Sequence, residues 1–284
     1  MKEASKHELS DIIFLDIETV RLQKNLSVGA TYSAWKYKMA RYSEEPLTVS
    51  YKNTASLYPE FAKIACISVG RVEDNKIIMK SYSGDEKELL SDFCSDLRKF
   101  ENAKPNLAIC GHAVKTFDIP FIFKRSIVHS ISPPDSIDIS GLKPWELTAI
   151  DTKELWKGTS TYSPSLVSVC LALNLETPKS DLSGAEVGGA YFNGEIDRIV
   201  KYCEKDVKRT IDVFLKIRLD PIIETVVRAS PKEIDSIIDD IYAKGQITKE
   251  QEKVILRECK DKEAALKLLK SISTVSDDLE NKLK

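Results

Sequence analysis

The spacing of apolar positions along the chain predicts an α/β protein in which helices pack on a sheet. Runs of apolar and β-branched residues predict buried strands at 11–17, 61–71, 77–82 and 107–110, and a short edge strand at 149–151. Apolar positions that recur every three or four residues predict helices at 85–100, 117–128, 163–173 and 195–217. Because the first strands follow one another and the later strands alternate with helices, we expect a mixed sheet with helices on both faces.

Residues that favour turns and caps set the expected boundaries of these elements. Glu73, Asp74 and Asn75 separate two strands so closely that they predict an antiparallel hairpin. Thr116 is a suitable N-cap for the helix that follows it, and Pro164 suits the first turn of the next helix. The stretch 176–194 contains Gly, Ser and Pro and is expected to be a loop.

Residues 21–60 break the pattern and indicate an insertion lying over the sheet. Their interleaved basic and aromatic side chains would suit binding of single-stranded nucleic acid. However, one face of a helix would also carry Tyr32, Trp35, Met39 and Tyr42, and we favour packing of that face on the core.

After Pro221 the sequence changes to charged helices, with capping boxes at 230–233 and 248–251. We therefore expect a sheet domain over 8–220 and a small helical C-terminal region over 221–284. This appendix carries no recognisable chemistry and is expected to be structural or to bind a protein partner.

Composition narrows the class of protein. The formal charge of the 284 residues is −2, which excludes the global basic field of a non-specific duplex binder. The six cysteines form no Cys-x-x-Cys pair, so we expect reduced core cysteines rather than a zinc site or a disulfide framework. The charged start has no signal-peptide pattern, and no apolar run approaches the ~20 residues of a membrane span. Both features indicate a cytoplasmic protein with no membrane partner.

Three short blocks hold the candidate chemistry. In the first, Asp16 and Glu18 alternate with Leu15 and Ile17 along a strand, so the two acids share one face. Two like charges on one face repel each other unless a cation lies between them. Taken alone, the pair would also fit a solvated strand end.

The second and third blocks add three residues. Asp118 falls at the start of a helix, where the helix dipole favours a carboxylate, and Tyr202 and Asp206 share one face of the helix at 195–217. Each of these also has an ordinary structural explanation. If the carboxylates of the three blocks lie together in a buried site, they need a shared cation. Hard divalent metals prefer oxygen ligands and would suit such a site.

The blocks FLDIET at 14–19, GHAVKTFD at 111–118 and YCEKD at 202–206 resemble the three motifs of the DEDD superfamily of 3′→5′ exonucleases, which have a ribonuclease H-like fold. Tyr202 stands four residues before the last Asp, as in the tyrosine subclass, whereas the histidine subclass would have His in place of Lys201. FLDIETV, LYPEFAKIACISVG and YCEKDVKRT further resemble predicted exonucleases related to the proofreading domain of family B DNA polymerases. The resemblance covers about residues 11–219.

The resemblance implies a two-metal hydrolysis of phosphodiester bonds at a nucleic acid 3′ end, with single-stranded DNA as the expected substrate. The metal ligands would be Asp16, Glu18, Asp118 and Asp206, holding two Mg²⁺ or Mn²⁺ ions. Tyr202 would orient the attacking water.

Contacts with the substrate strand are expected beside the second block. Phe117 could stack on the terminal base, although a core aromatic at a helix start is at least as good an interpretation. Lys115 could meet a phosphate. The family commonly has Asn a few residues before this Asp, and Ala113 in its place puts the positioning of substrate in doubt rather than metal binding.

Two alternatives remain open. The same site could act on RNA, because the motifs do not read the 2′-hydroxyl. A non-catalytic nucleic-acid-binding module on the same fold is also conceivable, but it would have no need of all five motif residues. The ~65 residues after the matching region are too few for a polymerase domain.

Overall fold

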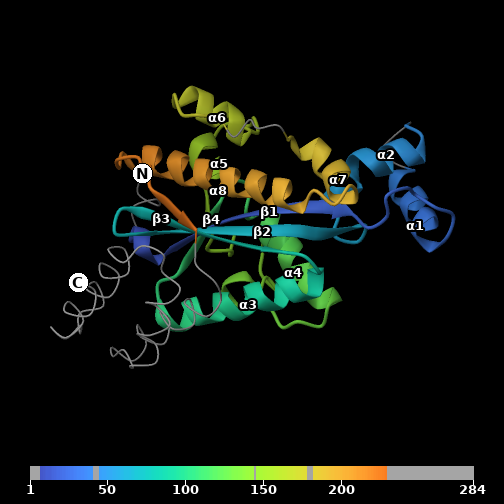
Figure 1. Cartoon of the computed structure of the whole chain (residues 1–284), viewed down its shortest axis with the longest axis horizontal. Coiled ribbons are helices and arrows are strands. Elements are labelled where there is room, and N and C mark those ends of the chain that lie inside the picture. Colours follow the sequence, from blue (N-terminus) through green and yellow to red (C-terminus); the bar gives the residue numbers. More distant parts are fainter. Residues whose placement is uncertain (1–6, 41–44, 144, 178–181, 229–284) are drawn as a thin grey trace, which may run out of the picture. The chain divides into compact units, whose positions relative to one another are not determined.

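The computed structural model describes residues 7–40, 45–143, 145–177 and 182–228 (Figure 1). By its contacts the chain divides into two units, Met1–Val227 and Arg228–Lys284, and the description below concerns the first. Both capping boxes predicted for the C-terminal helices, at 230–233 and 248–251, lie outside the described residues.

In the described residues one six-stranded sheet forms the centre of the unit, with the strand order β5-β4-β1-β2-β3-β6. The strands are β1 (Ile12–Arg21), β2 (Ala62–Glu73), β3 (Lys76–Ser83), β4 (Ala108–Gly111), β5 (Ile150–Asp151) and β6 (Val226–Arg228). β1 pairs antiparallel with β2 and parallel with β4, which in turn pairs parallel with β5. The predicted mixed, ribonuclease H-like sheet is therefore confirmed.

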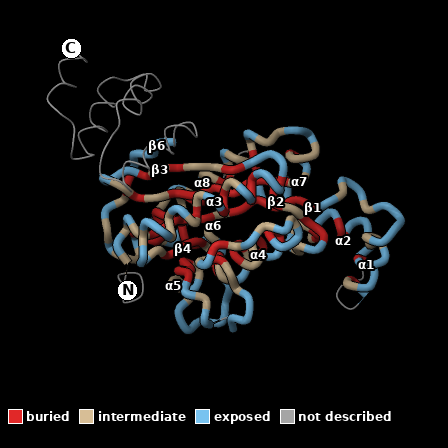
Figure 2. The backbone as a smooth tube through the Cα atoms, turned by 90° about the horizontal axis from the view of Figure 1, so that it is seen from below, coloured by how far each residue is buried: buried red, intermediate tan, exposed pale blue. Residues whose placement is uncertain are grey.

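Helices cover both faces of this sheet (Figure 1). α3 (Glu86–Ala103) and α4 (Asp118–Val128) pack on one face, and α8 (Ile196–Arg218) lies along the other. Beside α8 lie α5 (Thr152–Lys157), α6 (Leu166–Ala172) and α7 (Gly184–Phe192). Short 3-10 helices cover Leu9–Asp11, Ala55–Leu57 and Asp135–Ile137. Figure 2 shows that burial is heaviest along the central strands, which is where the two helical layers meet the sheet.

Close packing of α8 on β2 depends on a glycine. A Cβ atom at Gly70 would lie 2.9 Å from both Val207 Cγ1 and Ile211 Cδ1, which is shorter than real contacts of this kind. On the neighbouring strand, the rings of Phe14 and Phe214 meet edge to face at 5.4 Å. These contacts hold the helix that carries Asp206 directly against the strand that carries Asp16.

The predicted hairpin is confirmed. β2 and β3 pair antiparallel from Cys66 to Glu73, and the turn residues Asp74 and Asn75 have φ values of 47° and 58°. Two successive left-handed residues are typical of the type I′ turn, whose twist matches that of the flanking strands. Asp and Asn tolerate this conformation better than most other residues.

Two predicted helix starts are wrong. α6 begins at Leu166 rather than at Pro164, because Ser165 and Ser168 form a capping box one residue later. α4 has Phe117 at its N-cap position, with no side chain capping it. The Thr116 hydroxyl donates instead to the carbonyl oxygen of Ala113 at 3.2 Å, because the chain is still turning there.

The stretch predicted as a loop at 176–194 contains a helix, α7. It is closed at its start by Ser183 and Glu186, with the backbone N–H of Ser183 donating to Glu186 Oε2 at 3.0 Å. Val187 and Ala190 are buried beside α8, and their burial offsets the poor helix propensity of the glycines in this segment.

The insertion forms two helices, α1 (Ala30–Met39) and α2 (Leu47–Thr54), which lie beyond the end of β1 rather than over the sheet (Figure 1). Trp35 is fully buried and meets the rings of Tyr51 and Phe61 edge to face at 5.4 and 5.0 Å. Trp35 and Met39 are buried, as predicted, but they pack in a small separate cluster with Tyr51 and Phe61 rather than on the core of the sheet. Tyr42 lies outside the described residues.

A buried ion pair ties α3, β2 and α4 together on the face of the sheet opposite α8. Glu86 Oε1 accepts from the backbone N–H of Ile64 at 2.7 Å and from Arg125 Nε at 2.9 Å. Glu86 Oε2 accepts from Arg125 Nη2 at 2.5 Å and contacts His129 Nε2 at 2.7 Å. Burial acts to raise the pKa of Glu86, but the hydrogen bonds from Arg125 and His129 outweigh it and lower that pKa.

Five of the cysteines, Cys66, Cys94, Cys110, Cys170 and Cys203, are buried and unbridged, as predicted, and Cys259 lies outside the described residues. None of the described helices combines the length and the apolar character that a membrane crossing requires.

Candidate active site

The two acids of the first block lie on the α8 side of β1. Asp16 is opposite Ser68 and Glu18 is opposite Cys66 on β2. Leu15 and Ile17 belong to the core cluster on the α3 and α4 side of the sheet, so the predicted alternation along the strand is confirmed.

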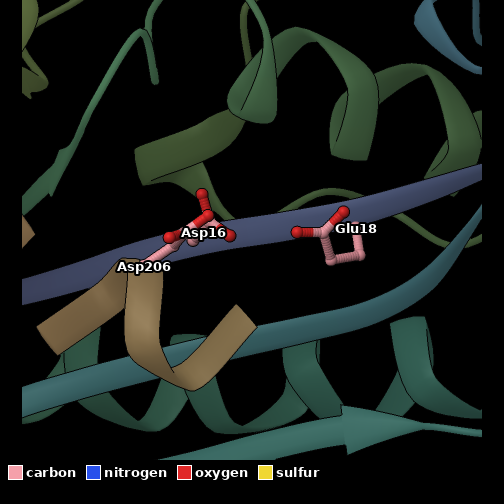
Figure 3. A group of neighbouring side chains, drawn as sticks. All are labelled: Asp16, Glu18 and Asp206. Carbon is pink, nitrogen blue, oxygen red and sulfur yellow. The ribbon is translucent and has the colours of Figure 1, made fainter. Parts of the chain in front are cut away.

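Asp206 of α8 joins this pair. Asp16, Glu18 and Asp206 each offer a carboxylate oxygen, and these oxygens all lie within 4.8 Å of one another (Figure 3). In Figure 3, the first two side chains come from β1 and the third from the helix beside it. The group is compact enough for its members to share one cation.

Asp118 lies next to this group of three. It is the first residue of α4 and is 3% exposed, and its Oδ1 accepts a hydrogen bond of 3.1 Å from the backbone N–H of Ile17. Its charge acts on both Asp16 and Glu18. The structure therefore brings together four carboxylates that the sequence holds up to 190 positions apart.

These carboxylates strongly perturb one another. Burial raises the pKa of Asp16 and of Glu18 well above the ordinary value, and the charges of Asp206 and Asp118 raise it further. Burial likewise raises the pKa of Asp118 and of Asp206 to about 7. Such a cluster keeps its negative charge at low cost only when a positive partner offsets both the desolvation and the repulsion.

One oxygen of the cluster has no partner at all. Within the part of the chain that the structure describes, Asp206 Oδ1 is buried and accepts no hydrogen bond. A buried carboxylate oxygen without a donor is costly in a folded protein. This observation and the all-oxygen donor set both fit a divalent cation of the Mg²⁺ or Mn²⁺ type.

Tyr202 borders the same group. Its hydroxyl donates a hydrogen bond to the Asp206 carboxylate one helical turn away. Burial, followed by the charge of Asp206, raises the pKa of Tyr202 well above its ordinary value. The hydroxyl thus stays protonated, and its single O–H is used by Asp206.

The sequence did not single out Cys203. Its thiol donates to Asp16 Oδ2 at 3.3 Å and to the backbone oxygen of Asp16 at 3.4 Å, so it holds that acid from the α8 side. Cys203 directly follows Tyr202 in the sequence. However, a cysteine among the apolar positions of a helix is expected to be a core residue when the fold is not known.

Lys115 and Phe117, the two residues predicted to contact substrate, make contacts within the protein. Lys115 Nζ forms a 2.9 Å salt bridge with Glu154 Oε2 on α5. Phe117 is half-buried, and its ring lies 5.5 Å from that of Phe121 at a tilt of 50°. Phe117 nevertheless adjoins Asp118 in the chain, whereas the amino group of Lys115 is already paired.

Several known structures contain similar chains. The family B DNA polymerase from the hyperthermophilic archaeon Pyrobaculum calidifontis matches with a TM-score of 0.46 and 13% sequence identity. The match covers 73% of this chain but only 24% of the polymerase, so the chain spans about a quarter of its length. No curated protein matches the sequence.

A family of sequences matches more than half of the chain. The model of the family described as predicted 3′-5′ exonucleases related to the exonuclease domain of PolB matches residues 55–225. The matched part contains Asp118, Tyr202 and Asp206, whereas Asp16 and Glu18 precede it. The chain belongs to this family of predicted 3′-5′ exonucleases.

Proposed function

We propose that this protein removes nucleotides from the 3′ end of single-stranded DNA by a hydrolysis that requires two divalent cations, Mg²⁺ or Mn²⁺. The observation that carries the proposal is the close group of Asp16, Glu18 and Asp206, with Asp118 beside it, in which the buried Asp206 Oδ1 has no hydrogen-bond partner among the described residues. Membership of the exonuclease family supports the same reaction.

Asp16, Glu18, Asp118 and Asp206 are the residues that would hold the cations. When bound, two cations lower the pKa of a water molecule and stabilise the charge that develops on the leaving oxygen. The carboxylates come from three separate elements, and the sheet and α8 fix their positions before any substrate arrives. Such preorganisation is a large part of what a protein contributes to phosphodiester cleavage.

Tyr202 orients the attacking water through its hydroxyl oxygen, which can accept a hydrogen bond from the water while the O–H donates to Asp206. Its hydroxyl is held toward the cluster by Asp206, and burial keeps it protonated. It therefore orients the water rather than removing its proton.

Phe117 and Lys115 are proposed to contact the substrate strand. Phe117 immediately precedes Asp118, so a base stacked on its ring would sit beside the acidic group, and such stacking is worth about 1–3 kcal/mol per base. Lys115 must first leave its pair with Glu154, so we expect a smaller effect from its replacement than from that of Phe117.

Residues 221–284 are proposed to form a separate helical region that binds a protein partner. The division of the chain at Val227 is compatible with this arrangement, since the acidic cluster lies wholly on one side of it.

The test uses 5′-labelled single-stranded DNA, single-stranded RNA and 3′-recessed duplex DNA, each with Mg²⁺, with Mn²⁺ and with a chelator. We expect a ladder of products shortened from the 3′ end of single-stranded DNA that depends on the metal. Degradation of RNA alone would assign the same chemistry to the other polymer. If the protein binds DNA or RNA but degrades neither in the presence of metal, it is a nucleic-acid-binding module rather than an enzyme.

A further inference from the structure

The loop that delivers Asp118 is held in an unfavourable backbone conformation. Between the end of β4 at Gly111 and the start of α4 at Asp118, Ala113 has a φ of 70°. In this left-handed region the Cβ of an ordinary residue crowds the following carbonyl oxygen, which is unfavourable. Something outside the loop must therefore hold it there.

The buried carboxylate of Asp151 does this. Its Oδ1 accepts from the backbone N–H of Ala113 at 2.9 Å, and its Oδ2 accepts from the backbone N–H of Lys115 at 3.3 Å. Its Oδ1 also caps α5 by accepting from the N–H of Lys153 at 3.0 Å. Asp151 is only 3% exposed, and β5 pairs it with Gly111, where the loop leaves the sheet.

The residue after Asp151 holds the same loop at its start. The Thr152 hydroxyl donates to the carbonyl oxygen of Gly111 at 3.1 Å and lies 3.0 Å from Nδ1 of His112. Downstream, the N–H of Ile119 donates to the carbonyl oxygen of Val114 at 3.1 Å, which connects the held loop to the first turn of α4. A continuous set of hydrogen bonds thus runs from β5 to the helix turn that bears Asp118.

We propose that Asp151 is a positioning residue of the nuclease site: it clamps the loop at 113–115 so that Asp118 meets β1 beside Asp16 and Glu18. The inference rests on the proposed function, because Asp118 is assigned there as a metal ligand. Asp151 lies outside the group of three carboxylates that could share a cation, and its two oxygens accept from backbone N–H groups. It acts on the site through the loop and also through its charge, which reaches Asp118.

The variant Asp151→Asn separates the clamp from the helix cap. Asn caps helices as well as Asp does, and its single amide oxygen can keep the bonds to Ala113 and Lys153. Its NH₂ group would face the N–H of Lys115, so this one bond is lost. Asp151→Ser also keeps a capping oxygen but is too short to span both loop amides, and it serves as the second variant if Asn prevents folding.

The experiment measures Mn²⁺ binding to the full chain by calorimetry, without nucleic acid, together with hydrogen exchange at the Lys115 amide. We expect Asp151→Asn to weaken Mn²⁺ binding by about 10- to 100-fold, the usual effect of removing a group that orients a ligand. Exchange at Lys115 should rise while exchange at Lys153 does not. The matched control is Glu101→Gln, because Glu101 Oε1 likewise holds a loop by accepting from the N–H of Ser136 at 2.7 Å, away from the site. That control should leave Mn²⁺ binding unchanged.

A double variant shows whether the effect passes through Asp118. In an Asp118→Ala background, Asp151→Asn should no longer change Mn²⁺ affinity, because the ligand that it positions is gone. The proposal would be overturned if Asp151→Asn weakened Mn²⁺ binding as much in the Asp118→Ala background as in the wild-type background. It would also be overturned if Asp151→Asn alone bound Mn²⁺ with wild-type affinity. If the wild-type chain does not bind Mn²⁺, the proposed function is wrong, and Asp151 cannot position a metal ligand. Faster exchange of the Lys115 amide in Asp151→Asn would still show that Asp151 holds the loop.

Discussion

The backbone N–H of Ile17 donates a 3.1 Å hydrogen bond to Oδ1 of Asp118 and so joins residues 101 positions apart in the chain. Ile17 lies between the two acids of β1. The bond therefore fixes the first residue of α4 beside the strand that bears Asp16 and Glu18, and it couples the first two sequence blocks through the backbone of β1.

Replacement of Asp118 by Asn tests the role of its charge. The amide oxygen can still accept from Ile17, so we expect the fold to survive and the metal-free chain to melt no lower than wild type, because repulsion within the cluster is relieved. The rate of 3′ removal should fall by about 10³-fold, which corresponds to about 4 kcal/mol. Single-turnover degradation and thermal melting measure the two effects. Asp138→Asn, in a loop, is the control and should leave the rate unchanged.

Tyr202→Phe removes a hydroxyl and keeps the ring. Since that hydroxyl is proposed to orient the attacking water, we expect kcat to fall by about 10²-fold with little change in KM, in the range known for loss of one preorganised hydrogen-bonding group. Steady-state kinetics on single-stranded DNA give both constants. The exposed Tyr37 provides the comparison, and an equal loss of kcat in Tyr37→Phe would contradict the assignment.

The ion pair of Glu86 with Arg125 predicts a stability effect far from the acidic cluster. Glu86→Gln leaves the buried Arg125 without its charged partner and should lower the free energy of unfolding by about 3 kcal/mol. Glu73→Gln, in a more exposed pair with Arg71, should cost less than about 1 kcal/mol. Urea titration at neutral pH compares the two variants.

The same pair predicts the direction of a pH effect. The pKa of Glu86 is lowered in the folded chain, so its contribution is present above the ordinary value of 4.5 and is lost as pH falls through the folded value. Between pH 6 and the acid limb, the wild-type chain should therefore lose more stability than Glu86→Gln does. Parallel slopes for the two proteins in chemical denaturation would contradict this account.

Removal of residues 229–284 should leave the nuclease reaction intact, because every residue proposed for it lies in the first unit of the chain. We expect kcat/KM on single-stranded DNA to stay within about threefold of the full chain, below the tenfold that 1.4 kcal/mol represents. A much larger loss would show that the C-terminal region contributes to substrate binding.

Sequence periodicity predicted the elements whose burial is regular. The long amphipathic pattern at 195–217 corresponds to α8, and the alternation around Asp16 corresponds to β1. It failed at α7, because Gly184, Gly188 and Gly189 weaken helix propensity and only tertiary packing compensates for them.

The residues of the candidate site could be predicted from the sequence where their type and spacing are unusual. Asp16, Glu18 and Asp206 could be singled out because carboxylates at the edges of apolar runs are unusual. Asp151 and Cys203 could not, because the role of Asp151 comes from the pairing of β5 with β4 and that of Cys203 from the position of α8 on the sheet. Such contacts between distant segments leave no periodic signal in the sequence.

The most direct measurement is the degradation of 5′-labelled single-stranded DNA by the wild-type chain and by Asp206→Ala, in Mg²⁺ or Mn²⁺ and in chelator. Asp197→Ala, near the start of the same helix, is the matched control. The account predicts a ladder of 3′-shortened products for wild type and Asp197→Ala with metal, and none for Asp206→Ala or in chelator. Full activity in Asp206→Ala, or activity that survives chelation, would contradict it.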